Sequence, residues 1–232
     1  MKPFNTYIEE GVHDPGIFKA FFTAGGPGSG KSYVATQGGM GGRKRGKMRM
    51  SPFGLKIVDS DPMFEKLLKQ AGLETTAKDI YSKRGQAIRD VAKGLIGKRQ
   101  AGWVEGRLGL LIDGTGKDYK KIQTLRTDLN SIGYDTYMLF VNTSLDVALQ
   151  RNEMRSRKLD STEVEKMWKA VQRNMGKFQL LFGRQNFILI DNNSASEDVF
   201  GKLFVQIKIL VDDPVTSKAA LAWIRSQLPQ PT

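Results

Sequence analysis

Five short, nearly continuous apolar runs divide the chain, and stretches with helical character lie between them. The runs span residues 17–23, 55–58, 108–112, 137–141 and 187–190. Runs without polar alternation are typical of strands that are buried on both faces of a sheet. Strands that alternate with helices predict an α/β fold, in which helices cover both faces of a parallel sheet.

The segments between the runs carry helix signals. Thr143 with Asp146 resembles a capping box before an apolar period, and Asp160 with Glu163 repeats the device. Apolar side chains recur three to four positions apart after Ser161, which predicts a long helix with Trp168 in the core. Further helices are predicted over residues 81–100, 198–210 and 217–228.

One segment, residues 37–54, departs from this pattern. It is rich in glycine and carries the basic residues Arg43, Lys44, Arg45, Lys47 and Arg49. Glycine disfavours regular structure and like charges repel one another, so the segment is predicted to form a mobile basic loop.

Composition agrees with a globular protein and narrows the choice of ligand. Hydrophobic residues make up 40% and charged residues 26%, and the formal net charge is +12, which favours an anionic partner such as a nucleotide or a nucleic acid. Cysteine is absent, which excludes disulfides, thiolate zinc sites and a cysteine nucleophile. No apolar run approaches the ~18 to 20 residues that cross a bilayer, and no signal peptide is evident, so we expect a cytoplasmic protein without a membrane partner.

A phosphate-binding motif follows the first run. Residues 25–32 match the pattern G-x-x-x-x-G-K-[ST] between a predicted strand and a predicted helix. The glycines let successive backbone amides point at phosphate oxygens, Lys31 can reach the β and γ phosphates, and the Ser32 hydroxyl can ligate Mg²⁺. ATP and Mg²⁺ are therefore predicted to bind at Gly25, Gly26, Pro27, Gly28, Ser29, Gly30, Lys31 and Ser32.

Carboxylates follow the second and third runs, at the edge where open α/β sheets bind ligands. A kinase for a hydroxyl needs a base near the γ phosphate, and we assign that role to Asp61. Asp59 either orients Asp61 or reaches the metal, although a helix cap before Pro62 is an alternative reading of this motif. Asp113 resembles a Walker B aspartate that holds a metal-bound water. Substrate binding is assigned to Asp59, Gly114, Thr115 and Arg89.

Arginines after the fourth run predict a helical lid over about residues 151–160. Arg151 and Arg155 lie one turn apart on one helix face, so they can converge on the phosphates of ATP as the lid closes. Solvent-exposed arginines without a ligand are the alternative.

These motifs together resemble the zeta-toxin and polynucleotide-kinase-like branch of P-loop kinases. The likeness rests on residues 25–32, 59–61 and 113–115, and the stretch 151–157 is similar to the lid of bacteriophage 5′-hydroxyl polynucleotide kinases. The resemblance to this family covers about residues 17–191. The resemblance implies a P-loop NTPase fold with a five-stranded parallel sheet, and it implies as functional residues the base Asp61 and the lid arginines Arg151 and Arg157.

We therefore predict an ATP-dependent kinase whose catalytic residues are Asp61, Lys31, Arg151 and Arg157. The acceptor is a hydroxyl of a nucleotide-like or nucleic-acid substrate, and the basic residues 43–49 slightly favour 5′-hydroxyl ends. A kinase of a UDP-linked amino sugar and a nucleic-acid-stimulated ATPase are the alternatives. One domain is expected over residues 1–232, with a core at about 17–191 and a C-terminal helical extension at 195–232.

Overall fold

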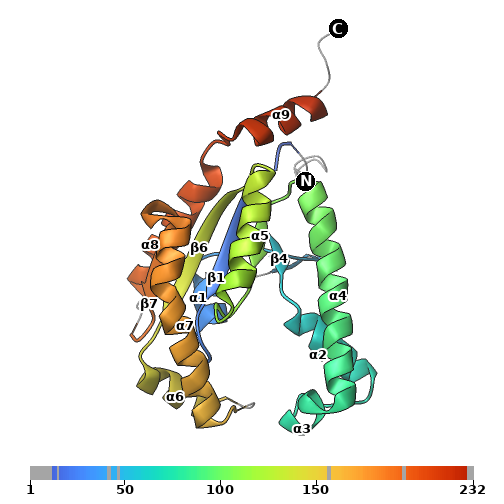
Figure 1. Cartoon of the computed structure of the whole chain (residues 1–232), viewed down its shortest axis with the longest axis vertical. Helices are drawn as coiled ribbons and strands as arrows, with labels where there is room; N and C mark the ends of the chain where they lie inside the picture. Colours follow the sequence, from blue (N-terminus) through green and yellow to red (C-terminus); the bar gives the residue numbers. More distant parts are fainter. Residues whose placement is uncertain are drawn as a thin grey trace, which may run out of the picture.

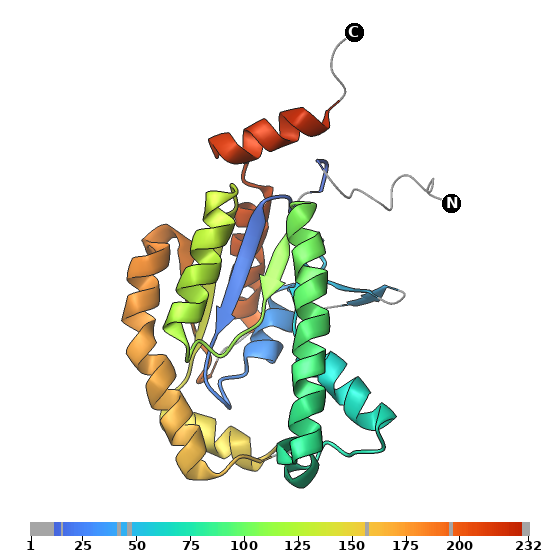
Figure 2. The same ribbon diagram turned by 45° about the vertical axis from the view of Figure 1, so that its right-hand side comes forward.

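The computed structural model describes residues 12–14, 16–40, 43–45, 48–155, 158–194 and 197–228, and it describes residues 43–45 and 48–50 by their backbone alone. Five parallel strands form its central sheet in the spatial order β4-β5-β1-β6-β7 (Figures 1 and 2). Each strand coincides with one of the predicted apolar runs, so the predicted parallel sheet is confirmed. The strands are β1 (Lys19–Ala24), β4 (Lys56–Val58), β5 (Leu110–Ile112), β6 (Asp135–Asn142) and β7 (Phe187–Asp191).

Two short strands within the glycine-rich segment extend this sheet, and the prediction of a mobile basic loop is wrong for them. β2 (Arg43–Arg45) pairs with β3 (Met48–Met50) in antiparallel fashion, and β3 continues the sheet beside β4 through the pair Met50 and Lys56. The open edge of β4 offers unpaired backbone groups, which can hold a strand whatever its side chains are. Binding of nucleic acid by residues 43–49 stays a prediction, because their side chains lie outside the described part of the chain.

Helices cover both faces of the sheet, as predicted, because side chains alternate along each strand. From β1, Phe22 faces a core shared with α4, α5, α7 and α9, whereas Phe21 faces a core shared with α1 and α8. The helices are α1 (Lys31–Gln37), α2 (Asp61–Gln70), α3 (Ala77–Tyr81), α4 (Lys83–Glu105), α5 (Tyr119–Ser131), α6 (Leu145–Glu153), α7 (Ser161–Phe182), α8 (Glu197–Asp212) and α9 (Lys218–Gln227), with a 3-10 turn over Arg184–Asn186. Within the described ranges, no helix is both long and apolar enough to cross a membrane.

The predicted lid, about residues 151–160, runs from the last turn of α6 to the N-cap of α7. Ser144 caps α6 by accepting a hydrogen bond from the backbone N–H of Val147, so the prediction of Thr143 as the cap is wrong by one residue. Thr143 instead accepts a hydrogen bond from the Trp168 indole at its carbonyl, 2.8 Å away. Asp160 caps α7 as predicted.

Candidate active site

The phosphate-binding loop connects β1 to α1 at the carboxyl edge of the sheet. Gly30 stands at the N-cap of α1 with a left-handed φ of 77°, and no side chain caps the helix. The first backbone N–H groups of α1 are therefore not taken by a capping side chain, which suits a phosphate. Gly25 donates its N–H to the carbonyl of Thr115 at 3.0 Å and so ties this loop to the segment after β5.

Gly28 packs this loop directly against α6. Its φ is 75°, and a Cβ there would lie 2.3 Å from the carbonyl oxygen of Ala148. Only glycine fits this position without a shift of backbone, because both the space and the left-handed conformation exclude a side chain.

Replacing Gly28 by alanine is therefore expected to lower the free energy of unfolding by more than about 2 kcal/mol, from left-handed strain and the clash with α6. ATP affinity should fall as well. Denaturant unfolding and titration calorimetry measure the two effects. Gly176→Ala is the matched control, because a Cβ at Gly176 in α7 meets no heavy atom within 4 Å, and it should gain up to about 1 kcal/mol of helix stability. Equal loss in both variants would contradict the packing of Gly28.

Lys31 is the charged centre of the site. Burial is the main cause that lowers the pKa of Lys31, and Arg155 lowers it further, whereas the carboxylates of Asp113, Asp61 and Asp59 raise it. Charged side chains shift the pKa of a lysine only when they lie close to its ammonium group. The fold therefore brings together the predicted lysine, all three predicted carboxylates and one predicted lid arginine.

Asp61 begins α2 and is separated from the end of β4 by Asp59 and Ser60. Its backbone N–H donates to Asp59 Oδ1 at 2.9 Å, so Asp59 fixes the turn that positions Asp61. Arg89 Nη1 reaches across from α4 to within 4.0 Å of Asp61 Oδ1. The Arg89 guanidinium stacks over the ring of Phe64, 4.2 Å from its centre. Residues 59–61 therefore both form the start of α2 and place two carboxylates in the candidate active site.

Asp113 directly follows β5 and is held by a residue that the sequence analysis missed. Thr23 at the end of β1 donates its hydroxyl to Asp113 Oδ1 at 2.6 Å and accepts the backbone N–H of Gly114 at 3.3 Å. Threonine at a strand end carried no recognisable signal, since its partner is 90 residues away in the chain.

The donor set of the site suits magnesium that is bound together with ATP. No cluster of three or more histidine, aspartate, glutamate or cysteine side chains able to hold a metal occurs among the described residues. Mg²⁺ commonly takes only one or two protein ligands, and phosphates and water supply the others. Ser32, exposed in the first turn of α1, and the exposed Asp113 are oxygen donors of this kind.

The lid arginines differ in their surroundings. Arg151, in the last turn of α6, donates from Nη2 to the carbonyl of Asn193 at 3.5 Å and keeps Nη1 buried without a hydrogen-bond partner in the described structure. That Nη1 would lie 3.7 Å from a Cβ at Gly30, so it is adjacent to the phosphate-binding loop. Arg155 is exposed. Arg157 lies outside the described residues, and its role stays a prediction.

Asparagines after β7 and in the lid also escaped the sequence analysis. Asn192, which is buried, donates from Nδ2 to the carbonyl of Ser29 at 2.8 Å and so braces the phosphate-binding loop. Asn152, also buried, holds the lid segment by two hydrogen bonds with the backbone of Leu159. The only available signal was the polar pair of residues 192 and 193 directly after a strand, at the edge that binds ligands.

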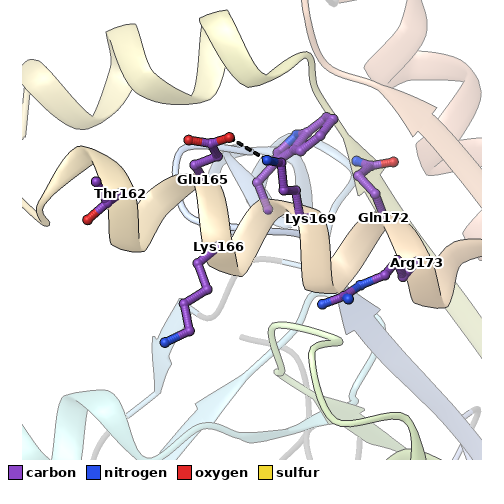
Figure 3. A pocket seen from close by; sticks show the side chains of 7 residues that line it. Thr162, Glu165, Lys166, Lys169, Gln172 and Arg173 are labelled. Carbon is purple, nitrogen blue, oxygen red and sulfur yellow. Dashed lines mark ion pairs between the residues drawn. The ribbon is translucent and has the colours of Figure 1, made fainter.

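α7 forms a wall beside the phosphate-binding loop. The Trp168 backbone would lie 3.5 Å from a Cβ at Gly26, and the ring is half-buried rather than fully in the core. The same face of α7 lines a cavity of about 530 Å³ (Figure 3). Lys169 pairs with Glu165 there at 2.5 Å.

The sequence model of the zeta toxin family matches residues 9–201. The chain belongs to the zeta toxin family. The resemblance predicted from the motifs is thereby confirmed, and this zeta toxin family member is a P-loop kinase that uses ATP as phosphoryl donor. No curated protein sequence matches it.

Solved structures similar to this zeta toxin family member include several kinases. Shikimate kinase from Bacteroides thetaiotaomicron has 12% identity and a TM-score of 0.50, covering 83% of this chain and 98% of its own. The PezAT toxin-antitoxin system of Streptococcus pneumoniae has 14% identity and a TM-score of 0.46, with coverages of 90% and 84%. The Pnkp1/Rnl/Hen1 RNA repair complex has 15% identity and a TM-score of 0.49, with coverages of 70% and 46%. Identities this low bear on the fold alone.

Proposed function

We propose that this kinase transfers the γ phosphate of ATP to a hydroxyl group of a nucleotide-like or nucleic-acid acceptor, with Asp61 as the general base. The observation that carries the proposal is the position of Asp61 at the carboxyl end of β4, where its charge acts on Lys31 of the phosphate-binding loop. A carboxylate beside the phosphate site has a role when the acceptor is a hydroxyl, because a phosphate acceptor has no proton to remove.

ATP is held by residues 25–32 in this mechanism. The backbone N–H groups of the loop and the Lys31 ammonium bind the β and γ phosphates. Arg151 and Arg155, joined by Arg157, stabilise negative charge on the transferred phosphoryl group. Ser32, Asp113 and Asp59 would hold Mg²⁺, which would supply positive charge that neutralises the phosphates. Asp59 also accepts the backbone N–H of Asp61 at Oδ1.

Phosphoryl transfer follows from this arrangement. The acceptor oxygen forms a bond to the γ phosphorus while the bond from that phosphorus to the β–γ bridging oxygen breaks, and ADP leaves. The proton of the acceptor hydroxyl passes to the Asp61 carboxylate. Asp59 fixes the backbone of Asp61, and Arg89 restricts its side chain. Gly114 and Thr115, beside Asp113, contact the acceptor.

The net charge of +12 favours an anionic acceptor. This feature fits a nucleotide, a nucleic-acid 5′ end and a UDP-linked amino sugar, so the test must separate them. The protein is incubated with γ-labelled ATP and each acceptor class, and the labelled product is identified. Label on a nucleotide or on a strand end supports the proposal. Label on a UDP-sugar alone indicates that the acceptor is a UDP-linked sugar. Label found only in inorganic phosphate indicates an ATPase.

A further inference from the structure

A second cavity, of about 460 Å³, lies between α4, α5 and residues 113–118, beside the active site. Its volume falls within the range of about 300 to 1,000 Å³ that is typical of small-molecule sites. Asp113 and Ser60 line the end that is nearest to the active site. The floor is apolar and is formed by Phe22, Val58, Ile96, Ile112, Ile122 and Leu125.

Hydrogen bonds fix the wall that residues 113–118 contribute. Asn174, buried in α7, donates from Nδ2 to the carbonyl of Gly116 at 2.9 Å and to that of Lys117 at 3.0 Å. Asp118 caps α5 by accepting the backbone N–H of Lys121 at 3.0 Å. The cavity is therefore built into the fold before any ligand binds.

Lysines give the rim a positive charge. Three lysines, Lys93, Lys117 and Lys121, line the cavity together with two carboxylates, Asp113 and Asp118, so the positive side chains are in excess. Lys93 lies 3.4 Å from Asp90, whereas no carboxylate of the described residues forms an ion pair with Lys117 or Lys121. Two ammonium groups beside an apolar floor suit a ring that carries an anionic group, since the ring removes apolar surface from water and the anion pairs at the rim.

The chemistry of the floor also discriminates between acceptors. Its six apolar side chains cannot hydrogen-bond to the hydroxyls of a sugar, whose polar groups would have to reach the polar lining side chains Thr23, Ser60, Gln100, Thr115 and Asp118 instead, because an unpaired buried polar group is costly. The flat face of a nucleobase carries no hydrogen-bonding group, so it leaves none unpaired when it packs on this floor. A few lysines neutralise one phosphate, whereas a strand gains affinity from many successive phosphate contacts.

We propose that this cavity holds the base of a monomeric acceptor, a nucleoside monophosphate, and this inference rests on the kinase function proposed above. The base lies on the apolar floor, the monophosphate pairs with Lys117 and Lys121, and a ribose hydroxyl is presented at the Asp113 end toward Asp61. That hydroxyl oxygen forms the new bond to the γ phosphorus, its proton passes to Asp61, and ADP leaves. The product is a nucleoside bisphosphate.

Gly97 of α4 provides a direct test, because it lines the cavity and a Cβ there meets no heavy atom within 4 Å. Gly97→Leu introduces a side chain at the cavity wall, and leucine has a higher helix propensity than glycine. Gly94→Leu is the matched control, since Gly94 is equally open and does not line the cavity. With γ-labelled ATP and the four ribonucleoside 5′-monophosphates, Gly97→Leu should raise the acceptor KM at least tenfold and leave ATP affinity unchanged. Gly94→Leu should stay within about twofold of wild type.

A second comparison probes the charged rim. The double variant Lys117→Gln with Lys121→Gln should raise the KM for the monophosphates at least fivefold, and should leave the KM for the corresponding nucleosides within twofold. An equal effect on both acceptors would overturn the pairing of the phosphate with these lysines.

The outcomes separate this inference from the function on which it rests. If wild type phosphorylates monophosphates and Gly97→Leu does so with an unchanged KM, the cavity assignment is wrong and the kinase function stands. If wild type labels only strand ends or UDP-sugars, the nucleoside monophosphate acceptor is wrong, and strand-end labelling leaves the proposed function intact. If no hydroxyl acceptor is labelled, the proposed function and this inference both fail.

Discussion

Asp61→Asn is expected to reduce kcat for phosphoryl transfer by about 10²- to 10⁴-fold, because asparagine cannot accept the proton of the acceptor hydroxyl. ATP affinity should change by less than about threefold. Asparagine retains the shape of the side chain, and the backbone N–H of residue 61 can still donate to Asp59. Steady-state kinetics with a saturating acceptor and calorimetry with ATP measure the two quantities separately.

The matched control for this prediction is Asp128→Asn, which alters an exposed aspartate of α5. It should keep wild-type kcat. An Asp61→Asn enzyme with more than a tenth of wild-type turnover would remove Asp61 from the role of base. Loss of ATP binding together with turnover would instead indicate that Asp61 shapes the nucleotide site.

Lys31→Met is expected to weaken ATP binding by about ten- to a hundredfold, because one charge-assisted contact to the phosphates is lost. In the absence of nucleotide, however, the same variant should unfold at a higher temperature than wild type. Burial lowers the pKa of Lys31, which means that the charged amine is unfavourable in the folded protein until phosphate is present. Methionine retains the length of the chain and removes this cost.

The sign of the pH dependence follows from the same shift. The folded pKa of Lys31 lies below its ordinary value of 10.5, so the unfolded chain binds more protons between the two values. The contribution of Lys31 to stability therefore rises as pH increases through that window, and Lys31→Met should lack this rise. Thermal unfolding with and without ATP measures both effects, and Lys98→Met in α4 serves as the exposed control. A Lys31→Met protein that is less stable than wild type without ATP, or that is equally stabilised by ATP, would contradict this description of the site.

The central sheet could be predicted because its strands appear as continuous apolar runs. β1 and β6 are buried on both faces, and the edge strand β7 keeps an apolar run although Leu189 is exposed. The hairpin β2–β3 could not be predicted, because it joins the sheet by backbone pairing of β3 with β4, which no local pattern of the sequence indicates. The N-cap of α6 was predicted at Thr143 and lies at Ser144. Thr143 and Ser144 are both good caps, and only the fold places the Ser144 hydroxyl, rather than that of Thr143, at the N–H of Val147.

Some residues of the active site could likewise be predicted from the sequence, and others could not. Lys31, Asp61 and Asp113 stand in local motifs with strand or helix flanks, so the sequence alone indicated them. Thr23 and Asn192 act on partners that are distant in the chain, and no local pattern identifies such residues. The cavity beside Asp113 is lined from β1, β4, β5, α4 and α5 together, so only the assembled fold reveals it.

The chemical linkage of the transferred phosphate tests the central claim most directly. ³¹P NMR of the product, formed from ATP and an acceptor that the enzyme turns over, distinguishes a phosphate ester from a phosphoanhydride. Transfer to a hydroxyl predicts a new phosphomonoester resonance that couples to a carbon-bound proton of the acceptor, with one ADP formed for each ester. A new phosphoanhydride, or inorganic phosphate as the only product, would contradict the claim.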